Sequence, residues 1–204
     1  LTDALKEKVL AADSMATLED IYLPYKPKRR TRAVMAKEKG LEPLALLIFE
    51  QNGKDPAAEA LSYVDPEKGV ASVEEALAGA RDIIAEIINE HPDARARLRD
   101  LFFSFAVVKC RVASGMEEKG AKYRDYFDWA EPVAAIASHR MLAIRRGEKE
   151  EILQFDILPD EDAATAILES MFVKGKTDDC LQVAQAVKET GANASVVYVP
   201  PPFA

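Results

Sequence analysis

The chain has 204 residues, 49% of them hydrophobic and 30% charged, which suffices for one large domain or two small ones with a packed core. No stretch approaches the roughly 20 apolar residues of a membrane helix, and the first residues lack the apolar core of a secretory signal. The formal net charge of −8 excludes a uniformly basic nucleic-acid-binding body, because an acidic chain repels phosphate on average.

The cysteines and the first residue bear on the compartment and on the extent of the chain. Cys110 and Cys180 belong to no CxxC pair and stand among apolar residues, as buried free thiols do. Reduced thiols of this kind are usual in the cytosol, so we expect a cytoplasmic protein with no membrane partner. Because the chain begins with Leu1 and not Met, we also expect the natural protein to extend further upstream.

Short helices separated by prolines and glycines are predicted for the N-terminal part. Apolar spacing indicates a helix over residues 1–21, and two prolines then hold residues 22–28 in an exposed, extended loop. The next helix is expected from Thr31 to Gly40, since glycine is common just after a helix end. A short, strongly apolar helix is predicted within residues 41–53.

Two long helices are predicted in the middle of the chain. A shorter one first begins at Asp55, with proline at its first position. The helix Ser72–His91 opens on a capping box in which Ser72 and Glu75 satisfy the first backbone donors. After a proline, the helix Asp93–Ser114 follows, and its wide apolar stripe indicates contacts on more than one side.

The C-terminal third mixes helices with short strands. We expect Ser138 to cap a helix that ends at Gly147, and Glu151–Ile157 to form a strand. Further helices are predicted over Asp160–Phe172 and Asp178–Glu189, followed by a β-branched strand at Ser195–Val199. The predicted fold class is therefore mainly α: a helical bundle or scaffold with one or two short strands near the C-terminus.

Positive charge is concentrated in residues 26–39. Seven basic residues against Glu38 give this segment a charge of +6, so the rest of the chain carries −14. Guanidinium groups bind phosphates bidentately and tyrosine rings stack on bases. The alternative is a solvated loop whose arginines pair with acidic helices of the same protein. The candidate nucleic-acid-binding residues are Tyr22, Tyr25, Lys26, Lys28, Arg29, Arg30 and Arg32.

Other chemically capable groups favour structural roles. The alternating arginines of residues 95–99 predict a solvated helix face, and the aromatic run Tyr123–Trp129 favours a core or a domain interface over a stacking platform. His91 and His139 have no partner at catalytic or metal spacing, so we expect them to cap or to pack. Since no phosphate-cradling glycine loop and no GxSxG motif is present, we predict no enzyme, no metal site and no cofactor.

Two long blocks of the chain resemble the bacterial Tex family of transcription accessory proteins. Glu19–Ala45 is similar to the family's run YLPYKPKRRTRA followed by GLEPLA, and Glu117–Leu153 is similar to its GAKYRDYFD, SHR and RRGE run. The resemblance covers about residues 1–186 and implies part of the family's N-terminal helical region. Tex-like proteins also contain an RNase H-like domain, helix-hairpin-helix elements and an OB-fold RNA-binding domain.

The resemblance implies partners as well as a fold. Nucleic acid (RNA or DNA) is the expected ligand, bound weakly by this fragment because the family's OB-fold is absent. The other domains of the full-length protein and the transcription machinery are the further partners that it implies.

Residues 187–204 depart from the Tex pattern. This tail resembles part of the CoA-binding domain of the succinyl-CoA synthetase α subunit, around TGASVIYVPPPFA, so we expect a foreign segment that comes from a fusion, an assembly error or an engineered chimera. It lacks the ligase's phosphate loop and phosphorylated histidine, and we carry no ligase activity over.

Three functions remain open at this point. The first is a fragment of a nucleic-acid-binding transcription accessory protein, acting as a non-catalytic helical scaffold with a basic and aromatic loop. The second is a protein-interaction or purely structural helical core without nucleic-acid binding of its own, and the third is a CoA-ligase-related fragment. Salt separates the first two, because phosphate binding weakens steeply with ionic strength and an apolar interface does not.

Overall fold

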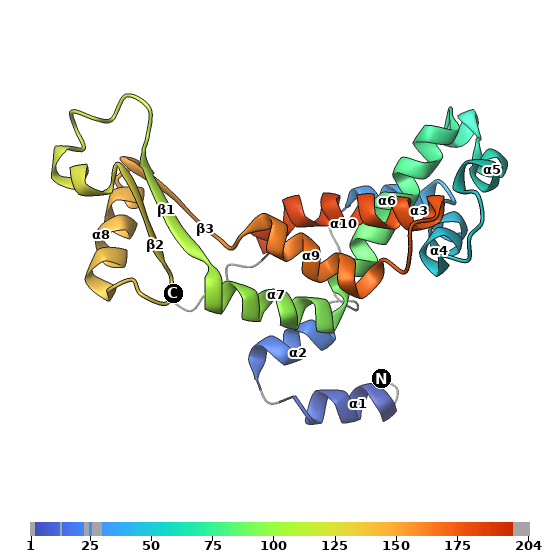
Figure 1. Cartoon of the computed structure of the whole chain (residues 1–204), viewed down its shortest axis with the longest axis horizontal. Coiled ribbons are helices and arrows are strands. Elements are labelled where there is room, and N and C mark those ends of the chain that lie inside the picture. Colours follow the sequence, from blue (N-terminus) through green and yellow to red (C-terminus); the bar gives the residue numbers. More distant parts are fainter. Residues whose placement is uncertain (1–2, 13, 23–24, 26–29, 198–204) are drawn as a thin grey trace. The chain divides into compact units, whose positions relative to one another are not determined.

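The computed structural model describes residues 3–12, 14–22, 25 and 30–197 (Figure 1). They fall into two compact units. The helical unit lies within Leu1–Arg97 and Thr165–Val197, and the sheet unit is Leu98–Ala164.

Short helices make up most of the helical unit, because proline and glycine interrupt its sequence often. The stretch predicted as one helix over residues 1–21 is divided in two, with α1 ending at Leu10 and α2 beginning at Met15. Two further helices, α7 (Pro92–Phe105) and α9 (Glu161–Phe172), each have residues in both units. The remaining elements are α1 (Asp3–Leu10), α2 (Met15–Tyr22), α3 (Arg32–Glu38), α4 (Glu42–Glu50), α5 (Pro56–Ala60), the 3-10 helices η2 (Leu61–Tyr63) and η3 (Pro66–Lys68), α6 (Val73–Glu90) and α10 (Asp178–Val197).

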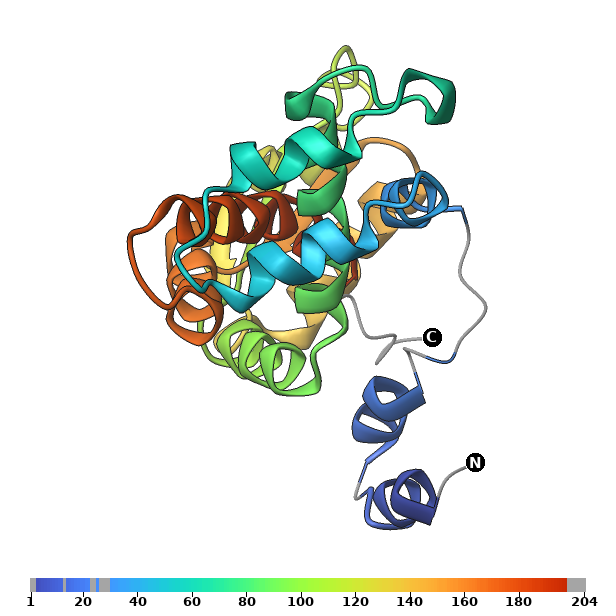
Figure 2. The ribbon, with the colours of Figure 1, turned by 90° about the vertical axis from the view of Figure 1, so that its right-hand side faces the viewer.

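Helix α6 is the centre of the core of the helical unit. Ala80, Ile83, Ile84 and Ile88 recur at helical spacing and are completely buried. They belong to a helix that packs against α3, α4, α5 and α10; Figure 2 turns this unit towards the viewer, with α6 in green and α10 in red. Because burying one such side chain contributes about 1.5–3 kcal/mol to folding, α6 firmly anchors the helices around it.

The predicted helix starts at Asp55 and Ser72 are confirmed. The Ser72 hydroxyl accepts a hydrogen bond from the backbone N–H of Glu75 at 3.2 Å. In return, the Glu75 carboxylate accepts one from the N–H of Ala71 at 2.7 Å, one residue earlier than a standard capping box would place it. Asp55 caps α5 in the same way, through the N–H of Ala57 at 2.9 Å.

The sheet unit is built on three antiparallel strands in the order β2-β1-β3. The central strand pairs Cys110 with Trp129 on one side and with Phe155 on the other. The 3-10 helix η4 and α8 pack on the sheet and enclose a core with Val108 and Ile144 at its centre. The elements of this unit are β1 (Val107–Val112), η4 (Ala121–Tyr126), β2 (Asp128–Pro132), α8 (Ser138–Lys149) and β3 (Leu153–Leu158).

The predicted helix Asp93–Ser114 is wrong in its second half. Helix α7 ends at Phe105, and the chain continues as strand β1. From Val107 the burial pattern has a period of two, with Val108 and Cys110 buried while Lys109 is exposed. The wide apolar stripe is therefore a helical pattern followed directly by a strand pattern, and the β-branched valines favour the strand.

The predicted mainly α fold is confirmed, and the strand predicted at Glu151–Ile157 is present as β3. The strand predicted at Ser195–Val199 is wrong for residues 195–197, because α10 continues as a helix to Val197. Residues 198 and 199 lie outside the described residues. No proline interrupts the chain between Asp178 and Pro200, so the helix can extend past the expected end at Glu189. Among the described residues, no helix combines the length and the apolar character needed to cross a bilayer.

Candidate nucleic-acid interface

The basic and aromatic segment joins the end of α2 to the start of α3. Tyr22 is the last residue of α2, and Thr31 caps α3 by accepting a hydrogen bond from the N–H of Val34 at 3.1 Å. This confirms the predicted helix start. Three of the candidate residues, Lys26, Lys28 and Arg29, lie outside the described residues.

The two described arginines of the segment have acidic partners in their own unit. Arg30 lies 3.2 Å from the Glu38 carboxylate, and Arg32 lies 3.4 Å from that of Asp82 on α6. This is the pairing that the solvated-loop alternative predicts. Both arginine side chains are nevertheless mostly exposed, and exposed ion pairs contribute only about 0–1 kcal/mol. A phosphate can therefore replace either carboxylate at little cost.

Part of the positive charge of residues 26–39 is used to hold α3 in place. Lys37 bonds the Glu86 carboxylate at 3.1 Å, and Thr31 donates to the other oxygen of the same group, also at 3.1 Å. Lys39 donates to the backbone carbonyl of Gly69 at 2.8 Å. The +6 charge counted in the sequence thus overstates what the segment presents to a ligand, because Lys37 and Lys39 are already bound within the protein.

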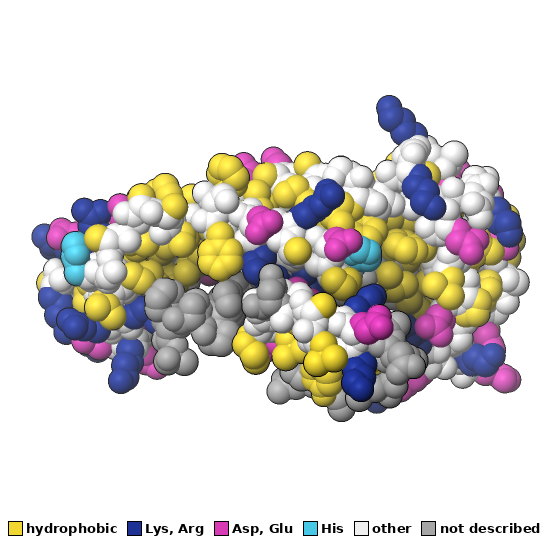
Figure 3. All heavy atoms as spheres, turned by 90° about the horizontal axis from the view of Figure 1, so that it is seen from below, with side chains coloured by type: hydrophobic (Ala, Val, Ile, Leu, Met, Phe, Trp, Pro, Cys, Tyr) yellow, Lys and Arg dark blue, Asp and Glu magenta, His cyan; other side chains and the backbone are white. Residues whose placement is uncertain are grey.

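The two candidate tyrosines line an apolar groove formed by α1 and α2. Tyr22 and Tyr25 are 53% and 62% exposed. The groove has a volume of about 720 Å³, and among the described residues Glu19 is the one acidic residue of its lining. Figure 3 shows hydrophobic side chains on the face from which α1 and α2 are seen. The rings are therefore accessible for stacking, but they also belong to an apolar surface. The remaining lining residues are Leu5, Val9, Met15, Leu18 and Ile21.

A buried ion pair attaches α2 to α7. Arg95 Nε lies 2.5 Å from Asp20 Oδ1, and the two side chains are only 11% and 5% exposed. The solvated helix face predicted for residues 95–99 is thus wrong for Arg95, although Arg97 is exposed. No local pattern in the sequence could reveal this pair, because its members are 75 residues apart. Breaking such a pair typically costs about 3–5 kcal/mol, so it positions α2, which ends at Tyr22.

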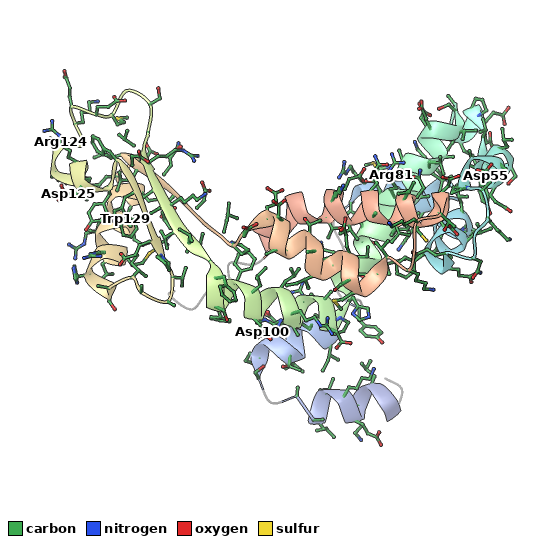
Figure 4. The ribbon with its side chains drawn as sticks, viewed as in Figure 1. Asp55, Arg81, Asp100, Arg124, Asp125 and Trp129 are labelled. Atoms are coloured by element: carbon green, nitrogen blue, oxygen red, sulfur yellow. The ribbon has the colours of Figure 1, made fainter. Side chains whose placement is uncertain are left out.

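The aromatic run Tyr123–Trp129 belongs to the core of the sheet unit, as the core interpretation predicted. Tyr123 is buried and donates its hydroxyl hydrogen to Glu150 at 3.0 Å. Tyr126 and Trp129 meet edge to face with ring centroids 5.8 Å apart. Figure 4 shows Trp129 between the sheet and α8. These rings are occupied by packing and do not offer a stacking platform.

The histidines and Cys110 show no sign of activation. His91 packs its ring edge-on against Phe172 at 5.2 Å, which confirms a packing role. His139 is exposed near the start of α8, where Ser138 is the first helical residue and not the predicted cap. Burial raises the pKa of the Cys110 thiol to about 11, so this group remains protonated at neutral pH.

Comparison with known proteins decides the family. Residues 51–193 match the family model described as Tex central region-like. The chain belongs to the Tex family. The family resemblance seen in the sequence is thereby confirmed. The family model that residues 51–193 match describes the central region of the family, whereas the resemblance in the sequence implied the N-terminal helical region.

Several curated relatives agree with this Tex assignment. The chain is 47% identical over 160 residues to Protein YhgF of Escherichia coli K12, covering 78% of the chain and 21% of that protein. It is 43% identical over 157 residues to Protein tex of Bordetella pertussis, covering 77% and 20%. It is 41% identical over 167 residues to the Transcriptional accessory protein Tex of Neisseria gonorrhoeae, covering 81% and 22%.

This Tex chain spans about a fifth of the length of the curated relatives it matches. The expected boundary between residues 1–186 and the tail 187–204 remains a prediction, as does the resemblance of that tail to succinyl-CoA synthetase.

Proposed function

We propose that this chain is a non-catalytic helical module of a Tex-type transcription accessory protein that contacts the phosphate backbone of nucleic acid through Tyr22–Arg32. The supporting observation is that exposed tyrosines at the end of α2 and exposed arginines at the start of α3 flank the basic residues between them. The name of the gonococcal relative, Transcriptional accessory protein Tex, agrees with such a role.

The proposal includes the partners and the compartment. Nucleic acid, RNA or DNA, is the ligand, while the remaining domains of the longer protein and the transcription machinery are the protein partners. Cys110 and Cys180 are buried free thiols, which suits a reducing compartment, so the proposed location is the cytoplasm.

Binding by this chain alone should be weak. The residues outside the basic segment carry a net charge of −14 and repel phosphate. Arg30 and Arg32 must also exchange Glu38 and Asp82 for the ligand. Phosphate contacts of this kind carry no sequence information, so we expect no base preference.

Charge reversal in the basic segment tests the proposal. The triple variant Lys28→Glu, Arg29→Glu, Arg30→Glu should abolish binding, because it removes three of the cations of the segment and adds three repelling carboxylates. Fluorescence polarisation at low salt, with labelled single-stranded RNA and DNA of about 20 nucleotides, provides the measurement. Circular dichroism should show an unchanged helical signal, since Arg30 is exposed and makes only a surface ion pair.

A matched control separates a local site from a general charge effect. Three exposed lysines elsewhere in the helical unit, Lys54, Lys68 and Lys176, can be reversed to give the same net charge. This control should retain most of the parent's affinity. Unchanged binding by the segment variant, or an equal loss in both variants, contradicts the proposed site.

The apolar groove of α1 and α2 favours a second function, that of a protein-interaction module. Its occupant would be an apolar helical segment from elsewhere in the same protein, because the curated relatives are about five times as long as the matched region. If the parent chain fails to bind nucleic acid at low salt, this function takes precedence. Its signature is an association that salt does not weaken.

A further inference from the structure

Helix α8 presents a positively charged face to solvent. Leu142, Arg145, Arg146 and Lys149 follow the i, i+3, i+4, i+7 spacing that places side chains on one side of a helix, and all four are exposed. Exposed His139 lies one turn earlier on the same side. These five residues are called the α8 basic face. Figure 3 shows Lys and Arg side chains near a histidine in the region of α8, on the left of the picture.

The packing of α8 fixes which side faces solvent. Ile144 and Gly147 are buried on the opposite side of the helix. A Cβ atom at Gly147 would lie 2.5 Å from the Leu153 Cδ1 atom, so the helix backbone lies directly against β3. The helix cannot rotate to bury its basic face without losing this contact. The orientation of the four long side chains is therefore set by the core of the sheet unit.

The charge on this face is only partly neutralised. Arg145 bonds the Glu148 carboxylate at 2.6 Å, and its guanidinium lies 5.7 Å from the centre of the Phe155 ring. Within the described residues, neither Arg146 nor Lys149 has an ion-pair partner. Three other cations of the sheet unit are paired with carboxylates, in Arg111–Asp156, Lys122–Glu150 and Arg140–Glu131.

A purely structural role for these cations makes a different prediction. Arg146 and Lys149 lie in the last turn of α8, where positive charge stabilises the negative end of the helix dipole. That role requires no ligand and predicts that their loss lowers the melting temperature only. It does not account for the shallow hollow of about 470 Å³ that Leu142, Arg145, Arg146, Glu148 and Lys149 line on the outer side of the helix.

We propose that the α8 basic face is a second surface of this chain that contacts the phosphate backbone of nucleic acid. This inference rests on the part of the proposed function that says the chain binds nucleic acid. Arg146 can bind a phosphate bidentately, and Lys149 supplies a point charge. Arg145 adds a third cation that is already oriented by Phe155 and Glu148. Since these contacts are to the backbone, the surface should accept RNA and DNA alike.

The double variant Arg146→Glu, Lys149→Glu tests this surface in the full chain. Lys109→Glu, Lys119→Glu is its matched control, because both lysines are exposed in the same unit and the change in net charge is identical. Binding of labelled single-stranded RNA and DNA of about 20 nucleotides is followed by polarisation between about 50 and 200 mM salt. The α8 variant should lower the steepness of log K against log salt by about one to two units, and the control should leave it unchanged.

Each outcome decides between the proposals. The α8 surface is overturned if the α8 variant binds nucleic acid like the parent chain. It is also overturned if the control variant loses as much binding as the α8 variant. Loss in the α8 variant with unchanged binding by the Lys28, Arg29, Arg30 reversal keeps the α8 surface and overturns the segment. Loss of binding in the segment reversal with unchanged binding by the α8 variant supports the proposed function and overturns the α8 surface. If the parent chain does not bind nucleic acid, both proposals are overturned.

A neutral variant guards against misfolding. Arg146→Gln, Lys149→Gln removes the two charges without adding repulsion, and it should reduce the salt dependence in the same direction by a smaller amount. If both α8 variants lower the melting temperature while binding persists, the cations serve the helix dipole and the inference is overturned.

Discussion

At the scale of single residues, Asp179 joins the first turn of α10 to the loop after α4. One carboxylate oxygen accepts the N–H of Gly53 at 2.7 Å, and the other accepts the N–H of Cys180 at 2.9 Å and the hydroxyl of Thr177. Burial by itself would raise the pKa of Asp179, but these hydrogen bonds together outweigh it, and the pKa lies below its ordinary value. The carboxylate therefore stabilises the fold at neutral pH.

Replacing this carboxylate gives a pH-dependent prediction. Asp179→Asn should lower the free energy of unfolding at neutral pH by roughly 1.5–3 kcal/mol, the usual contribution of hydrogen bonds to a charged group. Because the pKa is depressed in the folded state, this contribution is present above the unfolded pKa of about 4 and is lost as pH falls through the folded value. Urea unfolding at neutral pH and at about pH 3.5 should show the deficit shrink. Two results would contradict this account. One is a loss of unfolding free energy that is the same at both pH values, and the other is an equal loss caused by Asp178→Asn at the exposed neighbouring position.

Single-residue features were predictable where both partners are close in the sequence. The caps at Ser72 and Asp55 involve atoms two or three residues apart, so local patterns contain all the information. The pair between Asp20 and Arg95 depends on the packing of α2 against α7, which no local pattern encodes. For the same reason, the partners of Arg32 and Lys37 on α6 emerge only from the structure.

At the scale of whole elements, the main error lies where a helix meets a strand. Residues 98–112 are rich in apolar side chains, and such a run fits both a buried helix and a strand. The pairing of β1 with β2 and β3 decides in favour of the strand from Val107 onward. Those partners lie up to about fifty residues further along the chain, beyond the reach of a periodicity argument.

The end of α10 supplies the prediction at this scale. Among the residues of α10 whose burial the structure describes, Val183, Ala186, Val187 and Thr190 are buried, and they precede Gly191. Deleting residues 191–204 should therefore change the free energy of unfolding by about 1 kcal/mol or less. A deletion from Val183 onward removes this packing. The shortened chain should therefore fail to fold and should show no cooperative unfolding transition. If the shorter deletion abolishes folding, residues 191–204 are integral to the domain and the expected junction near residue 187 is wrong.

At the scale of the whole molecule, the concentration of positive charge in one segment makes this acidic chain a candidate for nucleic-acid binding. The sequence located the cations, but the structure shows that Lys37 and Lys39 are used internally and that Arg30 and Arg32 have acidic neighbours. It also shows the α8 basic face, whose spacing is visible in the sequence once the helix bounds are known. Charge counting along the chain therefore identifies a basic region, and the structure identifies which of its described cations already have partners within the protein.

The salt dependence of binding by the unmodified chain tests the central claim most directly. Five cations of the segment on a single strand, contributing about 0.7 each, predict that log K falls against log salt with a slope of about −3.5, and steeper if the α8 basic face also contacts the ligand. Polarisation of a labelled single strand between about 50 and 200 mM salt measures this slope. A linear decrease of this size, equal for different base sequences, is the predicted result. Binding that salt does not weaken, or no binding at the lowest salt, would contradict the claim that this chain contacts nucleic acid through its phosphates.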